Sequence, residues 1–118
     1  MKVQKLYENA LALIGKTEEG TSYPFMERVP SLLNLDLAVL NLYRSEDKQL
    51  PEVETIGDDI DLTAKEANGL TLCLAYTAAS EIDGFPENRL VTLYKQRNGV
   101  MGSITTGMED ITERIGVD

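Results

Sequence analysis

Residues 63–84, TAKEANGLTLCLAYTAASEIDG, carry the clearest helix signal in the chain. Thr63 and Glu66 fit a capping box, in which the threonine caps the helix and the glutamate occupies its third position. The apolar and alanine-rich residues that follow predict a helix to about Asp83, and Gly84 is typical of a helix end. The small residues on this helix would let a neighbouring helix approach closely. The stretch therefore predicts a helical fold.

Two more helices are predicted before this one. Residues 2–14 carry apolar side chains at spacings of three and four, and Gly15 follows at once. A second helix is expected over residues 22–43, with Pro30 kinking or dividing it. Its part over residues 31–43 is apolar nearly all round. Such a helix lies either at the centre of the core or under a partner, and both alternatives remain open here.

A fourth helix is predicted after residues 63–84. It runs from Glu87 to about Arg97, and Asn98-Gly99 is expected to end it. We expect four of its side chains to point inward: Leu90, Val91, Leu93 and Tyr94. Residues 100–118 contain three glycines and predict a flexible C-terminal tail. The sequence thus predicts an all-α bundle of four main helices, with a helical domain over residues 1–99 and a flexible docking tail over residues 100–118.

The segment between the second and third helices differs in composition. Pro51, Gly57 and Asp58-Asp59 disfavour a helix, so we expect a short irregular or hairpin-like loop. Residues 45–66 hold eight acidic and two basic side chains, which amounts to −6 of the total charge of −9. No calcium-binding pattern fits the acids of this loop, so we interpret it as a solvated acidic segment.

Composition excludes several classes of function. With 11 basic and 20 acidic residues, the chain is a poor candidate for binding nucleic acid through its phosphates. It has one cysteine, Cys73, and no histidine, so we predict no enzyme activity, no catalytic residue, no metal or cofactor site and no small-molecule substrate. Asp36 is the one acid with apolar surroundings, and we expect it to point outward or to pair with a Lys or Arg. The longest apolar window, residues 69–80, is too short to cross a membrane, which predicts a cytoplasmic protein without a membrane partner.

Three stretches carry a family resemblance. They are KLYENALALIG (residues 5–15), MERVPSLLN (26–34) with the Leu50-Pro51 loop after it, and the alanine-rich helix followed by the Pro86–Tyr94 helix and the ending ITERIG (111–116). In this order they resemble the small helical head-to-tail connector (adaptor) proteins that are encoded beside portal genes in tailed phages and prophages. The tail departs from the family pattern because no aromatic residue follows Ile111.

The resemblance implies a structural protein of virion or prophage assembly. Such proteins form a ring, commonly of twelve subunits, below the portal protein, and DNA passes through the ring without specific binding. The implied partners are further copies of the chain, the portal protein and a stopper or completion protein on the tail side. The implied location is the host cytoplasm during assembly and the neck of the virion afterwards.

Three groups of residues are candidates for these contacts. Acidic side chains would repel DNA in the lumen or face the next ring: Glu52, Glu54, Asp58, Asp59 and Asp61. Apolar residues of the tail would dock on the portal or on a neighbouring subunit: Ile104, Met108, Ile111 and Ile115. Apolar residues of the second helix would form the subunit interface: Leu35, Val39 and Leu42. The alternative function is a small acidic helical binding protein, either an inhibitor or a DNA-mimic regulator, whose carboxylates would spread over one face.

Overall fold

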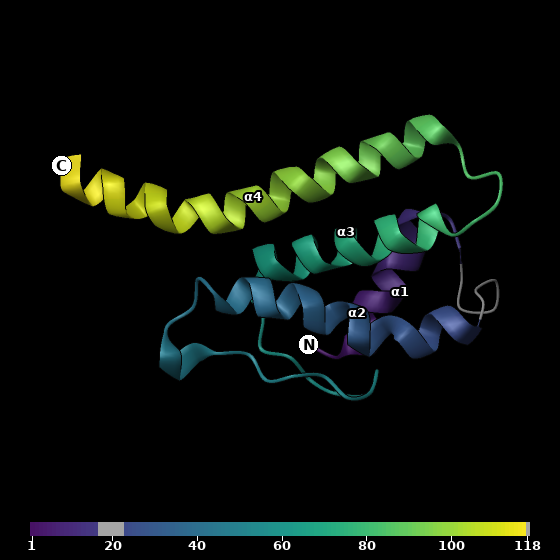
Figure 1. Ribbon diagram of the computed structural model, residues 1–118, viewed down its shortest axis with the longest axis horizontal. Helices are drawn as coiled ribbons and strands as arrows, with labels where there is room; N and C mark the ends of the chain where they lie inside the picture. Colours follow the sequence, from purple (N-terminus) through teal and green to yellow (C-terminus); the bar gives the residue numbers. More distant parts are fainter. Residues whose placement is uncertain (17–22, 118) are drawn as a thin grey trace.

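The computed structural model describes the backbone of residues 1–16 and 23–117 and the side chains of residues 1–16 and 25–105 (Figure 1). Its elements are α1 (Val3–Leu13), α2 (Tyr23–Asn41), a short 3₁₀ helix (Glu46–Lys48), α3 (Ala64–Ser80) and α4 (Glu87–Val117). Within this part of the chain there is no β-strand, and the single β-bridge joins Lys2 to Asp59. The prediction of an all-α bundle is confirmed, and the connection between α2 and α3 takes the irregular form.

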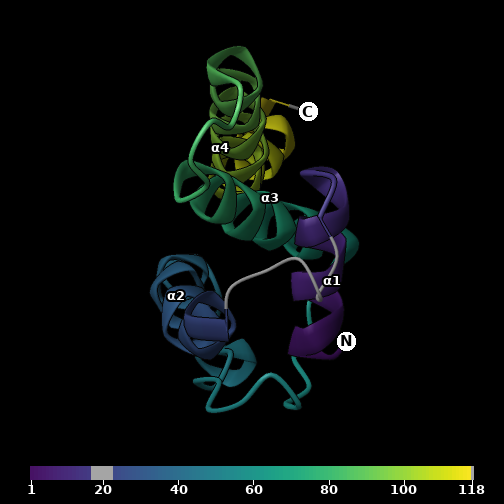
Figure 2. The same ribbon diagram turned by 90° about the vertical axis from the view of Figure 1, so that its right-hand side faces the viewer.

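Residues 63–84, which carry the clearest helix signal, contain the central helix α3. α3 packs against α1, α2 and α4, and Figure 2 shows it between α4 on one side and α1 and α2 on the other. Its capping box is present, because the Thr63 side chain accepts from the Glu66 backbone and the Glu66 carboxylate accepts from the Thr63 backbone. The left-handed Gly15 (φ 75°) follows α1 as predicted. α3 ends at Ser80, three residues before the predicted Asp83, and the left-handed Gly84 (φ 78°) lies in the turn that follows.

The core lies where α1 and α2 meet α3. Its fully buried side chains come from all three helices, and Tyr7 of α1 stacks on Phe25 of α2 with ring centroids 6.1 Å apart. α2 is not divided at Pro30, and it is not the central helix of the bundle. Its inward side supplies buried residues at spacings of three and four: Val29, Leu33, Leu37 and Leu40. Its outward side remains apolar, and the section below describes it.

The predicted end of the fourth helix at Asn98-Gly99 is wrong. α4 continues to Val117 and runs antiparallel to α3, past the start of that helix (Figure 1). Local propensity disfavours glycine in a helix by about 1 kcal/mol, but packing outweighs it here. Gly69 of α3 allows the close contact, because a Cβ at that position would lie 2.8 Å from Met101 Sδ and 3.1 Å from Ile104 Cδ1. The helical path of residues 100–117 gives the molecule its longest dimension of 50 Å.

Candidate interaction surface

The outward side of α2 carries an exposed apolar row, which we call the α2 stripe: Leu35, Val39 and Leu42. The exposed fractions of these side chains are 70%, 42% and 78%. Spacings of four and three place them on one face of the helix and the turn that follows it. Asp36 is the only charged residue between positions 31 and 43, so the stripe is uncharged in a protein with a net charge of −9. The structure places the predicted interface residues together at the surface, and their contact with another subunit stays a prediction.

A pocket of about 140 Å³ is lined by residues of α2, α3 and α4, and Leu35 of the stripe is one of them. Its polar lining residues are Asp36 of α2, Cys73 and Thr77 of α3, and Arg97 of α4. Burial raises the pKa of Asp36, while the charge of Arg97 and a hydrogen bond from Cys73 oppose the shift only in part. Burial and the neighbouring Asp36 carboxylate raise the pKa of Cys73 to about 12, so its thiol stays protonated and unreactive at neutral pH.

Two exposed side chains of α4, Val91 and Tyr94, contradict the prediction that they point inward. They are 45% and 47% exposed, whereas Leu93 is buried. α4 packs mainly on α3, and a helix with one packing partner needs only a narrow apolar face. Tyr94 rests against Tyr76 of α3, with ring centroids 5.4 Å apart. This side of the bundle therefore has aromatic packing at its edge.

A third side of α2, between its inward and outward sides, is occupied by the acidic loop of the chain itself, and we call it the loop face. Asn34 donates to the carbonyl of Val53 and accepts from its N–H, at 2.9 and 2.7 Å. Asn41, two helical turns further on, makes the same pair of bonds with Leu50, at 2.9 and 2.8 Å. The two amides thus bind the acidic loop along α2 as a neighbouring strand would.

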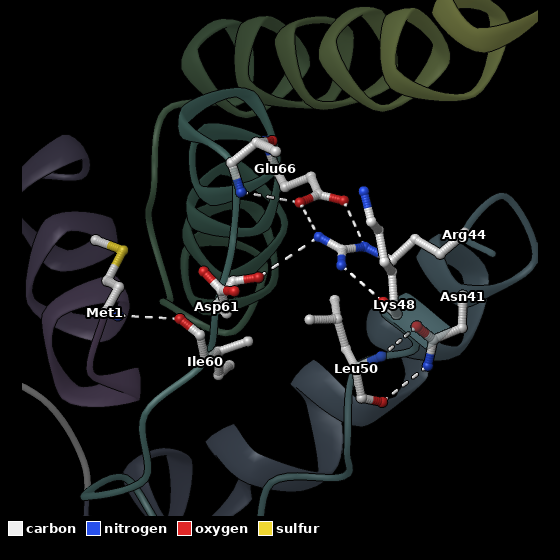
Figure 3. Close-up of polar contacts among 9 residues, drawn as sticks. Met1, Asn41, Arg44, Lys48, Leu50, Ile60, Asp61 and Glu66 are labelled. Atoms are coloured by element: carbon white, nitrogen blue, oxygen red, sulfur yellow. Dashed lines mark hydrogen bonds and ion pairs between the residues drawn. The ribbon is translucent and has the colours of Figure 1, made fainter. Parts of the chain in front are cut away.

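Arg44 joins the end of α2 to the start of α3 (Figure 3). Its guanidinium donates to both carboxylate oxygens of Glu66, at 2.5 and 3.1 Å, and to the Lys48 carbonyl at 2.8 Å. The side chains of Arg44 and Glu66 are only 18% and 9% exposed. Burial alone would raise the pKa of Glu66, but the hydrogen bonds from Arg44 and Thr63 and the charge of Arg44 outweigh it and lower the pKa. The pair therefore holds three segments of the fold together.

The acidic loop lies on the side of the molecule away from α4 (Figures 1 and 2). Side chains of Glu52, Glu54, Asp59 and Asp61 are exposed there. Asp58 accepts hydrogen bonds from the backbone N–H groups of Glu54 and Thr55, which lower its pKa. Asp59 forms an ion pair with Lys2 at 3.7 Å. The structure thus brings the five predicted acids together on one loop, and two of them also stabilise it.

The predicted docking residues separate into two groups. Ile104 is half-buried against α3 beside Gly69, so it belongs to the fold of the single chain. The backbone of Met108, Ile111 and Ile115 continues α4, and their side chains lie outside the described residues. Whether these three dock on a partner stays a prediction.

Sequence reasoning missed the polar contacts of α2. The spacing of Asn34 and Asn41 is seven residues, which places both on one face, and this was the available signal. The partner of Glu66 had no comparable signal, because Arg44 lies 22 positions away in an irregular segment.

Comparison with family models, curated proteins and solved structures gives no match for this chain. Among the side chains that the structure describes, those of residues 1–16 and 25–105, no group of three potential metal ligands is present. Over residues 1–16 and 23–117, no helix combines the length and the hydropathy that crossing a bilayer requires.

Proposed function

We propose that the protein is a structural assembly protein of a tailed phage or prophage, a head-to-tail connector that forms a ring below the portal. The observation that carries the proposal is the α2 stripe. Three large apolar side chains lie exposed on one helix face of the single chain, and such patches are typical of protein–protein contacts. The order of the helices and the sequence resemblance supply the specific kind of assembly.

Charge distribution supports the same proposal. The acids of the loop are concentrated on one edge, while the α2 stripe carries none. In a ring, acidic loops that line the lumen would repel the phosphates of passing DNA and keep it from binding. The partners would then be further copies of the chain, the portal protein and a completion protein on the tail side. The protein would act in the host cytoplasm during assembly and in the virion neck afterwards.

The experiment that tests this proposal uses the portal protein encoded in the same genome. Purified chain and portal are mixed, the mass is measured by light scattering, and complexes are imaged by negative-stain electron microscopy. We expect a ring stacked on the portal. A folded, helical protein that never associates with the portal would contradict the proposal and favour the alternative, an acidic regulator.

A pair of variants makes the test specific to the α2 stripe. Leu35→Lys places a charge in the stripe, whereas Ala12→Lys places one on the exposed side of α1. We expect both variants to fold, and only Leu35→Lys to lose assembly. Equal assembly by the two variants would show that the stripe is not the contact.

A further inference from the structure

We infer that the α2 stripe binds the C-terminal part of α4, residues 108–115, of a second copy, in an antiparallel helix pair. The inference deepens the proposed function and rests on it only for the existence of an assembly. A ring needs two different surfaces that match each other, because a patch that binds itself closes into a two-fold dimer. The α2 stripe supplies one surface, and the second must lie elsewhere on the chain.

The end of α4 is placed to reach another molecule. Ile104 of α4 contacts Gly69 of α3. From Ile104, 13 residues remain to the end of α4, whereas Gly69 lies only five residues after the start of α3. Because the helices are antiparallel, about eight residues of α4 extend past the start of α3, a length of about 12 Å at 1.5 Å per residue. Figure 1 shows this end of α4 beyond the rest of the bundle. The segment therefore cannot cover the α2 stripe of its own chain.

The apolar spacings of the two surfaces match in one direction only. Leu35, Val39 and Leu42 have gaps of four and then three residues. Met108, Ile111 and Ile115 have gaps of three and then four, so the gaps coincide when the helices run in opposite directions. Both sets span about 10 Å of helix. The antiparallel register pairs Leu35 with Ile115, Val39 with Ile111 and Leu42 with Met108.

Charge is also compatible with this pairing. Helical spacing places three acids of the segment, Glu109, Asp110 and Glu113, on the side opposite its apolar residues. The apolar side would therefore meet the α2 stripe, whose three members are all uncharged. Two copies that each carry a charge of −9 repel one another, and the contact lies where neither surface adds to that repulsion.

Disulfide cross-linking between full-length variants tests the register. Val39→Cys and Ile111→Cys proteins are mixed and oxidised, and Glu113→Cys replaces Ile111→Cys as the matched control on the opposite side of the helix. Native Cys73 is buried and stays protonated, so it does not compete. We expect the Val39→Cys and Ile111→Cys mixture to form several-fold more dimer than the control mixture or either protein alone. A chain with both substitutions should give a ladder of dimers, trimers and larger species on a non-reducing gel.

Two outcomes would overturn the inference. Val39→Cys alone cross-linking as well as the mixture would indicate a symmetric contact between two α2 helices. A mixture that cross-links no better than its Glu113→Cys control would exclude the segment as the occupant. If wild-type chains still stack as a ring on the portal in either case, the inference fails while the proposed function stands. If the variants cross-link in the predicted register but the wild-type chain never binds the portal, the inference stands and the proposed function fails.

Discussion

The loop face and the α2 stripe belong to the same helix, but the chain covers only the first of them. The loop face binds the backbone of the chain's own acidic loop. Asn34 forms two hydrogen bonds with Val53, and Asn41 forms two with Leu50. The α2 stripe, on the outward side of the helix, leaves two leucines more than two-thirds exposed. Apolar residues alone therefore do not mark the core of this protein. What separates the faces is whether another part of the same chain is positioned to cover them.

Two leucines, two residues apart, give the largest contrast between the inward and outward sides of α2. Leu40 is 1% exposed and Leu42 is 78% exposed. Leu40→Ala should lower the free energy of unfolding by about 3–4 kcal/mol, because it leaves a cavity in the core. Leu42→Ala should change it by less than about 0.5 kcal/mol. Urea unfolding followed by circular dichroism measures both, and a similar loss in both variants would contradict the assignment of the stripe to the surface.

Arg44→Met should remove about 3 kcal/mol of stability, because it leaves the Glu66 carboxylate buried without its charged partner. Arg28→Met is the matched control. Arg28 pairs with Glu81 at 2.6 Å, but both side chains are more than 40% exposed, so the loss should be about 0.5 kcal/mol or less.

The same pair predicts a pH dependence. The pKa of Glu66 is lower in the folded protein than in the unfolded chain, so the folded state binds fewer protons at acidic pH. The stability from this group is complete above the ordinary Glu pKa of about 4.3 and is lost as the pH falls through the lower folded value. The difference between wild type and Arg44→Met should therefore shrink on acidification. A difference that is constant with pH would contradict the role of the ionised carboxylate.

Asn41→Ala tests how strongly the loop face holds the acidic loop. It leaves the N–H and the carbonyl of Leu50 without their partner, which should cost about 1.5 kcal/mol. Asn68→Ala, on the exposed side of α3, should be neutral or slightly stabilising. Hydrogen exchange at the Leu50 amide should rise in the first variant only, and unchanged protection there would count against the amide bonds.

Asp36→Asn gives the smallest predicted effect, and its sign is opposite. Because burial raises the pKa of Asp36 despite the nearby Arg97, the ionised form is disfavoured in the folded state. The substitution should increase stability at pH 7 by about 0.5 kcal/mol or less. The folded state binds more protons than the unfolded chain between the two pKa values, so the gain should appear as the pH rises through that range. Equal stability of the two proteins from pH 3 to 7 would contradict it.

Local signals predicted those parts of the fold that local forces determine. The Thr63–Glu66 capping box predicted the start of α3, and Gly15 predicted the end of α1, because each acts within a few residues. The end of α3 was predicted at Asp83, three residues after its end at Ser80. Asn98-Gly99 misled because its local preference is outweighed by contacts with Gly69, some 30 positions earlier. Leu35, Val39 and Leu42 were found from the excess of apolar residues on α2. The Arg44–Glu66 pair depends on the tertiary path of the acidic loop, which no local pattern determines.

Gly69 also has a mechanical consequence. At Gly69 the two helices lie close together, and the 13 residues of α4 beyond Ile104 form an arm of about 20 Å that extends from that contact. A rotation of about 10° at that contact would displace the tip by about 3.5 Å, more than half a turn of helix. The absence of a side chain at Gly69 thus allows the close contact from which the arm extends. In an assembly of identical copies, such a displacement would let each arm adjust to its neighbour while the bundle beneath it stays rigid.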